Sequence, residues 1–245
     1  MKDLFDFTGK KVLVTGSTQG IGFAIAKAFS EKGATVYVNG AESEEKVHKA
    51  TEKIKNAVAT VVDLSKKDCA DQMYEITGNI DILVLNASVQ VRKVWEEITD
   101  EEYDKQMDIN FRSSLKLCQK YVPSMKENKW GRIVAIGSVQ QRKPHKDMLV
   151  YACSKAAQMS LVENLSKQLA TYGITVNNVA PGVIATPRNK EALSDAEYAK
   201  KVMEGIPMGY AGNPDDCTGL IMTLCSDSAR YITGENIYVD GGMKL

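Results

Sequence analysis

The chain has 245 residues, and its 31 Lys and Arg residues are balanced by 31 Asp and Glu residues. This length allows one large α/β domain or two small ones, and it buries enough surface to fold without disulfides or metal ions. The balanced charge gives no reason to expect a nucleic acid or an anionic membrane as partner. Five cysteines, an odd number without a C-x-x-C pair, indicate reduced thiols and a cytoplasmic location. The acidic start of the chain has no signal-peptide pattern, and no apolar run is long enough to cross a membrane.

A glycine-rich turn follows the first predicted strand. Residues 11–14 form a short apolar run, and residues 16–22 then carry glycines in the spacing G-x-x-x-G-x-G. Apolar residues at helical spacing follow as far as Phe29. Such glycines allow a tight turn, and a helix that begins there presents unpaired N–H groups to a pyrophosphate. A tight strand-to-helix turn without a ligand is the alternative, but the strand–turn–helix context favours a dinucleotide site.

Strand-like apolar runs alternate with helical stretches along the whole chain. This alternation predicts a Rossmann-type, doubly wound parallel sheet of about seven strands, with helices on both faces and a ligand beyond the carboxyl ends of the strands. No linker or repeat divides the chain, so we expect one domain over 1–245, with a cofactor half at roughly 1–136 and a catalytic and substrate half at roughly 137–245. The predicted strands lie near 11–15, 34–39, 58–62, 81–85, 131–136, 174–180 and 235–239.

Two local signals predict helix boundaries. Pro123 is expected to bend or end the helix that begins near Glu101, because proline has no N–H for the helical ladder. Asn213 followed by Pro214 and two acidic residues is typical of a helix start, with Asn213 as the N-cap and Pro214 in the first helical position.

Tyr151 and Lys155 are the leading catalytic candidates. They lie four positions apart, at i and i+4, so a helix projects both side chains from one face. An ammonium beside a phenol favours the phenolate, which makes Tyr151 suitable as a general acid and base. Ser138, thirteen residues before Tyr151, supplies a hydroxyl that can hold a carbonyl or alcohol oxygen. Cys153 lies between the pair on another helix face, and we interpret it as a packing residue.

Together these segments resemble the short-chain dehydrogenase/reductase family, and the resemblance covers essentially the whole chain. Each match is modest, but the ordered set is specific. The matching segments are Gly16–Gly22, Val62-Asp63-Leu64, Leu85-Asn86-Ala87, Asn110, Ser138, Tyr151 with Lys155, Pro181-Gly182 and the C-terminal stretch 237–242.

The resemblance implies an NAD(P)-dependent oxidoreductase that interconverts a secondary alcohol and a ketone. Tyr151 would protonate the carbonyl oxygen in the reductive direction, and Ser138 would position that oxygen. Lys155 would bind the nicotinamide ribose, and Asn110 would hold a water that links Lys155 to solvent. Taken singly, Asn110 could cap the following turn and Ser138 could close the strand that ends at Ile136, because both residue types favour such places.

The same resemblance implies a coenzyme site and no metal site. NAD is favoured over NADP, because Gly40 and Ala41 leave no basic residue for a 2′-phosphate and Glu42 would repel one. The residues expected to bind the coenzyme are Gly16, Ser17, Thr18, Gln19, Gly20, Ile21, Gly22, Asn39, Ala41, Asp63, Leu64, Asn86, Ala87, Tyr151, Lys155, Pro181, Gly182, Ile184 and Thr186.

Two departures from the family pattern concern the walls of the site. Ser88 stands where the family usually has a glycine, so we expect a slightly narrower passage for the coenzyme ribose. Pro187 directly follows Thr186, the expected carboxamide-binding residue, and should stiffen the start of the substrate loop.

The loops expected around the substrate carry bases and amides and few large apolar groups. This favours a small polar substrate such as a sugar, polyol or sugar acid over a steroid or long acyl chain, although loop lysines and arginines are often merely solvated. The expected substrate residues are Ser138, Gln140, Tyr151, Arg92 and His145, of which His145 is more typical of a simple loop residue.

Two other functions stay open from the sequence. A 3-oxoacyl-carrier-protein reductase would use a basic patch, to which Arg92, Lys126, Lys129 and Arg132 could contribute. A non-catalytic nucleotide-binding regulator would have no use for Tyr151 and Lys155 together. The resemblance also implies a homotetramer or homodimer, with contacts through the helix that begins at Glu101, the helix that carries Tyr151, and the C-terminal segment.

Overall fold

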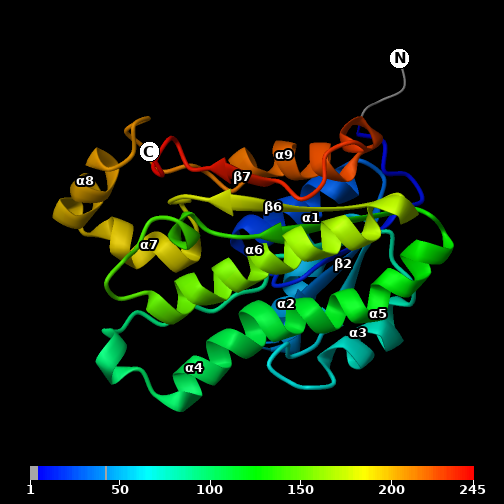
Figure 1. Ribbon diagram of the computed structural model, residues 1–245, viewed down its shortest axis with the longest axis horizontal. Helices are drawn as coiled ribbons and strands as arrows, with labels where there is room; N and C mark the ends of the chain where they lie inside the picture. The colour runs from blue at the N-terminus through cyan, green and yellow to red at the C-terminus, as the bar shows by residue number, and fades with distance from the viewer. Residues whose placement is uncertain (1–4, 42) are drawn as a thin grey trace.

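The structure is a computed structural model that describes residues 5–41 and 43–245, apart from the side chains at 191 and 192. The expectations placed on Glu42 and on the first four residues therefore lie outside the described residues. Within them, seven strands form one parallel sheet in the order β3-β2-β1-β4-β5-β6-β7 (Figure 1). The order reverses direction between β1 and β4, which is the switch point of a doubly wound fold. The predicted fold class is confirmed.

The strands follow the apolar runs of the sequence closely. Every residue of β4 and β5 is buried, as expected for strands that are covered on both faces. Each observed boundary lies within two residues of its predicted range. The strands are β1 (Lys11–Val14), β2 (Thr35–Gly40), β3 (Ala57–Val61), β4 (Ile82–Leu85), β5 (Gly131–Ile136), β6 (Ile174–Pro181) and β7 (Asn236–Val239).

Helices cover both faces of the sheet. Figure 1 shows α1 and α9 along one face and α3, α5 and α6 along the other. Because side chains alternate along a strand, Val12 and Val14 enter the core beneath α1 and α9, while Leu13 enters the core beneath α3, α5 and α6. The α-helices are α1 (Gly20–Glu31), α2 (Glu44–Thr51), α3 (Cys69–Thr77), α4 (Asp100–Met107), α5 (Ser113–Glu127), α6 (Leu149–Leu169), α7 (Pro187–Ser194), α8 (Ala196–Glu204) and α9 (Asp215–Cys225).

The helical segment between β4 and β5 differs from the prediction. Pro123 lies inside α5, which continues to Glu127, so the helix does not end at this proline. Leu117, Tyr121 and Met125 of the same helix are fully buried against the sheet, and their packing offsets the penalty of about 3 kcal/mol for an internal proline. The irregularity occurs earlier, where a wide π-helical turn, η2 (Asp108–Arg112), joins α4 to α5.

The last long helix begins one residue later than predicted. Pro214 is the N-cap of α9 and Asp215 is its first helical residue. Asn213 still belongs to the start, because its N–H donates to the carboxylate of Asp216 at 2.6 Å. Such a contact is typical of helix N-termini, where an acidic side chain of the first turn accepts a hydrogen bond from the backbone N–H just ahead of the helix.

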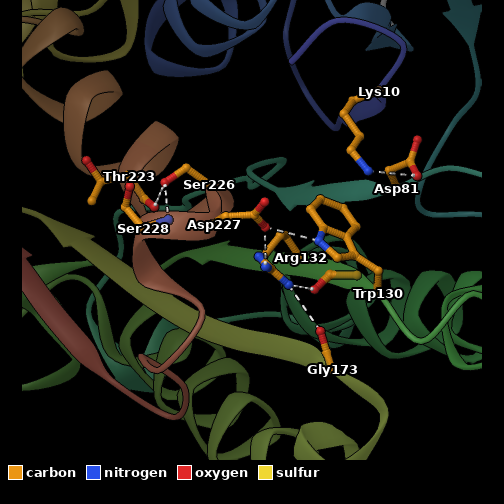
Figure 2. Close-up of polar contacts among 10 residues, drawn as sticks. Lys10, Asp81, Trp130, Arg132, Gly173, Thr223, Ser226, Asp227 and Ser228 are labelled. Atoms are coloured by element: carbon orange, nitrogen blue, oxygen red, sulfur yellow. Dashed lines mark hydrogen bonds and ion pairs between the residues drawn. The ribbon is translucent and has the colours of Figure 1, made fainter. Parts of the chain in front are cut away.

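A polar cluster joins several strands where they begin, at the end of the sheet away from α7 and α8 (Figures 1 and 2). The buried Arg132 guanidinium donates to the carbonyls of Gly131 and Gly173 and to the Asp227 carboxylate, the last at 3.2 Å. Its centre lies 4.4 Å from the ring centroid of Trp130, whose ring also lies 3.7 Å from the ammonium of Lys10. The cluster therefore ties the starts of β1 and β5 to the segment after α9.

The structure also bears on a membrane location. Over residues 5–41 and 43–245, none of the helices combines the length and the apolar character that a bilayer crossing requires.

Candidate active site

A cleft opens beyond the carboxyl ends of the strands, where a doubly wound sheet is expected to bind its ligand. Its walls come from the segments that follow β1, β4, β5 and β6, together with the first turn of α7. Its volume of about 350 Å³ lies in the range of small-molecule sites. The predicted residues that line it are Gly16, Thr18, Gln19, Gly20, Ile21, Gly22, Asn39, Ala41, Asp63, Leu64, Asn86, Ala87, Arg92, Ser138, Gln140, Tyr151, Pro181, Gly182, Ile184 and Thr186.

The glycine turn has the geometry that a pyrophosphate requires. Gly16 has a φ of +60°, and a Cβ added there would lie 2.8 Å from the Cα of Ala87. A Cβ on Gly22 would lie 2.4 Å from the side-chain nitrogen of Asn86. No side chain caps α1, which begins at Gly20. The N–H groups of its first turn can therefore donate hydrogen bonds to an anion. The turn therefore fits the phosphates of a dinucleotide.

Ser17 and Asn39 hold this turn in place. Ser17 is fully buried and does not line the cleft; its hydroxyl donates to the Val14 carbonyl at 2.6 Å and accepts from the Asn39 N–H at 3.0 Å. Asn39 accepts from the Gly16 N–H and donates to the carbonyls of Thr60 and Val62. Ser17 was expected to bind the coenzyme, but its side chain shapes the turn from behind.

The adenosine end of the cleft is lined by short side chains. A Cβ on Gly40 would lie 2.6 Å from a methyl group of Thr18. Any side chain larger than that of glycine would therefore require a shift at this position. Asp63 accepts from the Ser65 N–H at 2.9 Å. Burial raises the pKa of Asp63, but the hydrogen bonds from Ser65 and the charges of Lys66 and Lys105 together outweigh it, so the pKa is lowered overall. Asp63 is thus held as a carboxylate at the cleft wall.

Tyr151 and Ser138 bring two hydroxyl groups to the wall of the cleft. Tyr151 lies in the first turn of α6, and Ser138 follows β5. The Ser138 oxygen accepts from the Gln140 N–H at 3.2 Å as the cap of a short 3-10 turn. Ser138 therefore both caps a turn and lines the cleft, and its hydroxyl hydrogen can be donated to a bound oxygen.

Lys155 and Asn110 lie behind this wall and not on it. Lys155 is 1% exposed, and its ammonium donates to the Ile136 carbonyl at 2.7 Å and to Gln158 at 3.0 Å. Burial and, to a smaller extent, the positive charge of Arg188 together lower the pKa of Lys155 to about 7. Asn110 is fully buried; its side chain bonds to both main-chain groups of Val89 and donates to Ser154. Neither residue is among those that line the cleft.

Guanidinium and amide groups gather at the substrate end of the cleft. Arg92, Gln140, Arg188 and Asn189 all line it. The Oε1 atom of Gln140 is buried, and no described residue donates a hydrogen bond to it. His145 was expected here, but its ring accepts from the Asp147 N–H within its own loop and does not line the cleft.

Two neighbours of the site, Arg188 and Gln158, were not singled out as site residues from the sequence. Arg188, at the second position of α7, lines the cleft and contacts Ser88. Gln158 bonds to Lys155 and lies one helical turn beyond it, so the helical spacing that pairs Tyr151 with Lys155 could have identified it. Cys153 was interpreted as a packing residue, and this is wrong for the chain as described, because its side chain is exposed.

The part of the chain that the structure describes contains no cluster of metal-ligating side chains. There, His, Cys, Asp and Glu side chains form no group of three or more that could hold an ion.

Comparison with known proteins assigns the family. Residues 16–244 match a family model described as enoyl-(acyl carrier protein) reductase. The glucose 1-dehydrogenase of Gluconobacter oxydans is 38% identical over 250 residues, which covers 98% of this chain and 93% of that protein. The match thus spans the glycine turn, the cleft and the C-terminal strand.

Solved structures agree with this fold. A protein of Agrobacterium tumefaciens described as a gluconate dehydrogenase superposes with a TM-score of 0.94 at 28% identity, covering 98% of each chain. A 3-oxoacyl-(acyl-carrier-protein) reductase from the same species, solved with NADP bound, gives a TM-score of 0.91 at 32% identity, covering 98% of this chain and 96% of that one. The chain belongs to the short-chain dehydrogenase/reductase family of oxidoreductases, which act on CH–OH and keto groups.

Proposed function

We propose that this chain catalyses the NAD(P)-dependent interconversion of a secondary alcohol and a ketone on a small polar substrate. The observation that carries the proposal is that the hydroxyls of Tyr151 and Ser138 line the same cleft as the glycine turn. Lys155 lies buried behind them, one helical turn from Tyr151. A single cleft thus combines a phosphate-binding turn with an acid/base residue.

The proposed mechanism assigns a role to each residue. The bound coenzyme supplies or accepts the hydride. In reduction, the Tyr151 hydroxyl gives its proton to the carbonyl oxygen, and the Ser138 hydroxyl donates a hydrogen bond that fixes this oxygen. The Lys155 ammonium orients the nicotinamide ribose. Asn110 holds the wall from behind, through Val89 and Ser154. In oxidation, Tyr151 takes the alcohol proton.

NAD is the favoured coenzyme, with NADP as the alternative. Gln19, Gly40 and Ala41 line the adenosine end of the cleft and include no positive charge for a 2′-phosphate. At Gly40 even an added Cβ would lie 2.6 Å from a methyl group of Thr18, so a basic side chain does not fit there without a shift. The related reductase solved with NADP keeps the alternative open, and Lys46 or the backbone near Ser43 would then contact the phosphate.

The substrate end favours a polyhydroxy compound, and a sugar acid best of all. The buried acceptor of Gln140 suits a substrate hydroxyl, because a buried polar atom without a partner is costly. Arg188 and Arg92 add two positive charges that suit a carboxylate. The gluconate and glucose dehydrogenases among the similar proteins act on compounds of this class.

Acyl-carrier-protein reduction is the second candidate, favoured by the similar reductase and by the description of the family model. The residues expected to form its basic patch do not lie on one exposed surface. Arg132 is 2% exposed and bonded within the polar cluster at the start of β5, whereas Arg92 lines the cleft at the other end of the strands. A carrier that docks at the cleft would therefore meet Arg92 but not Arg132. A purely regulatory role has no use for the proton-transfer residues.

We further propose that residues 1–245 act as one unit, with coenzyme bound mainly by residues up to about 136, and that the chain assembles as a homotetramer or homodimer. Trp95 and Tyr103, in and near α4, are 63% and 48% exposed, and Leu149 at the start of α6 is 48% exposed. Burial of such side chains between copies would stabilise the assembly. Sedimentation as a monomer at every concentration would contradict it.

The decisive experiment is a substrate panel with both coenzymes. Sugar acids, neutral sugars, polyols and a 3-oxoacyl thioester are each followed by nicotinamide absorbance in both directions. The proposal expects the highest kcat/KM with a sugar acid or related hydroxy acid. Turnover only of the thioester would establish the second candidate, and no turnover of any alcohol or ketone would contradict both.

A further inference from the structure

Lys155 belongs to a hydrogen-bonded network that includes Gln158 and Ser114, two residues to which the proposed mechanism assigns no role. Gln158, on the same face of α6, accepts from the Lys155 ammonium at 3.0 Å. Its amide nitrogen donates to the Ser114 hydroxyl at 3.0 Å, and this hydroxyl donates to the Asn110 carbonyl at 3.2 Å. The network crosses from α6 to the adjoining end of α5 (Figure 1). None of these side chains is more than 3% exposed.

The chemistry of the partners fixes the direction of every bond. An ammonium can only donate, so the oxygen of the Gln158 amide must face Lys155. The amide nitrogen must then face Ser114, whose hydroxyl accepts from it and passes its own hydrogen to the Asn110 carbonyl. A buried network with every member satisfied holds one geometry, since any rotation leaves a polar atom without a partner.

We propose that Gln158 is a positioning residue for Lys155, anchored through Ser114 to the main-chain carbonyl of Asn110. The Ile136 carbonyl and the Gln158 oxygen take two of the three ammonium hydrogens. The third hydrogen stays available for another acceptor, which we assign as the ribose or Tyr151. The part that concerns the ribose rests on the function proposed above, whereas the contact with Lys155 does not.

A neutral amide holds the ammonium without compensating its charge. Among the described residues, no carboxylate forms an ion pair or hydrogen bond with Lys155, and the charge that acts on it is that of Arg188. Asp108 and Arg112, on the turn packed against α6, pair with each other at 2.8 Å. Tyr151 is the titratable neighbour on the same helix face. An amide also has no proton to exchange readily, so Gln158 holds Lys155 and does not conduct protons.

The test compares Gln158→Glu and Gln158→Met with the same changes at Gln168, which lies exposed on the same helix. The first readout is the melting temperature between pH 6 and pH 10, which follows Lys155 without any coenzyme or substrate. A carboxylate beside the ammonium should raise the titration midpoint of Lys155 by about one pH unit or more, and loss of the acceptor should lower it. The Gln168 variants should leave the midpoint unchanged.

The second readout is binding of NADH and NADPH, followed by nicotinamide fluorescence at each pH. Loss of a hydrogen bond to a charged group predicts binding at pH 7 about tenfold weaker in Gln158→Met, with little change in Gln168→Met. Ser114→Ala should shift the Lys155 midpoint in the same direction as Gln158→Met but less, and it replaces any Gln158 variant that does not fold.

Two outcomes separate the inference from the function on which part of it rests. If the Gln158 and Ser114 variants lower the melting temperature without moving the Lys155 midpoint, Gln158 is only a packing residue and the inference is wrong. If they move the midpoint but Lys155→Met binds both coenzymes as well as the unmodified chain, the contact is established and the ribose role of Lys155 fails.

Discussion

Arg188 donates hydrogen bonds to both oxygen atoms of Ser88, at 3.0 Å to the hydroxyl and 2.5 Å to the carbonyl. Arg188 belongs to the first turn of α7 and Ser88 to the loop after β4, so the pair spans the cleft. The serine stands where the family usually has a glycine and, unlike glycine, supplies a hydroxyl partner. The guanidinium is thus held at the cleft wall.

Replacement of Arg188 should discriminate between charged and neutral substrates. Arg188→Leu is expected to reduce kcat/KM for a carboxylate substrate by about 10- to 100-fold, the value of a hydrogen bond to a charged group. A neutral polyol should change by less than threefold, because it does not depend on the charge. Steady-state kinetics with matched acid and alcohol substrates check this, with Lys190→Leu on the same helix as control. Equal losses for both substrates would contradict a role in charge recognition.

Removal of the Tyr151 hydroxyl should abolish chemistry and spare binding. Tyr151→Phe keeps the ring in the wall of the cleft but removes the transferable proton, so kcat is expected to fall by about 10²- to 10⁴-fold. Coenzyme affinity, followed by fluorescence, should stay within a few fold. Tyr172→Phe, a half-exposed residue at the far end of the same helical segment, is the control. Turnover near that of the unmodified chain would mean that another group supplies the proton.

The coenzyme preference should follow the charge beside the adenosine ribose. The unmodified chain is expected to bind NAD(H) more tightly than NADP(H). Ala41→Arg should move the affinity ratio toward NADP(H) by about tenfold or more, the value of a charge-assisted hydrogen bond to the 2′-phosphate. Ala41→Gln tests the length of the side chain without its charge. Titration with both reduced coenzymes decides the matter; tighter NADPH binding by the unmodified chain would assign the phosphate to Lys46 or to the backbone near Ser43.

The lowered pKa of Lys155 predicts how stability depends on pH. The folded chain loses this proton near pH 7, whereas the unfolded chain keeps it up to the ordinary value of 10.5. Between these values the unfolded state binds more protons, so the free energy of unfolding should rise with pH. The contribution of Lys155 is a slope of about 1.4 kcal/mol per pH unit. Denaturant unfolding at several pH values measures it, and Lys155→Met should remove this part; identical slopes in both proteins would contradict the lowered pKa.

The sequence predicted most of the fold because the determining signals are local. A strand covered on both faces needs an apolar run, and the glycine turn needs glycine wherever a Cβ would collide, as at Gly16 and Gly22. These requirements are visible without tertiary structure. The cleft could be predicted because parallel strands bring their carboxyl ends to one edge.

The sequence could not place residues whose surroundings depend on contacts between distant segments. Pro123 remains helical because its neighbours are buried against the sheet, and Ser17 faces inward because its hydroxyl bonds to β1 and β2. His145 lies close in sequence to Tyr151, yet its loop turns it away from the cleft. Arg132 resembles a surface base in sequence, but Trp130 and Asp227 enclose it. Propensity and motif spacing contain no information on any of these contacts.

The wide turn of η2 bears on how the helical segment between β4 and β5 tolerates a change in its number of residues. The Ser113 N–H bonds to the carbonyl of Asp108, five residues back, and the Ser113 and Ser114 hydroxyls donate to the carbonyls of Ile109 and Asn110. A turn of this kind accommodates one residue more than a regular helix. Deleting one residue between Asp108 and Arg112 would close the wide turn into a regular helical turn and leave the direction in which α5 presents its side chains nearly unchanged. The wide turn therefore absorbs one extra residue while Ser114, in the first turn of α5, still meets Gln158 of α6.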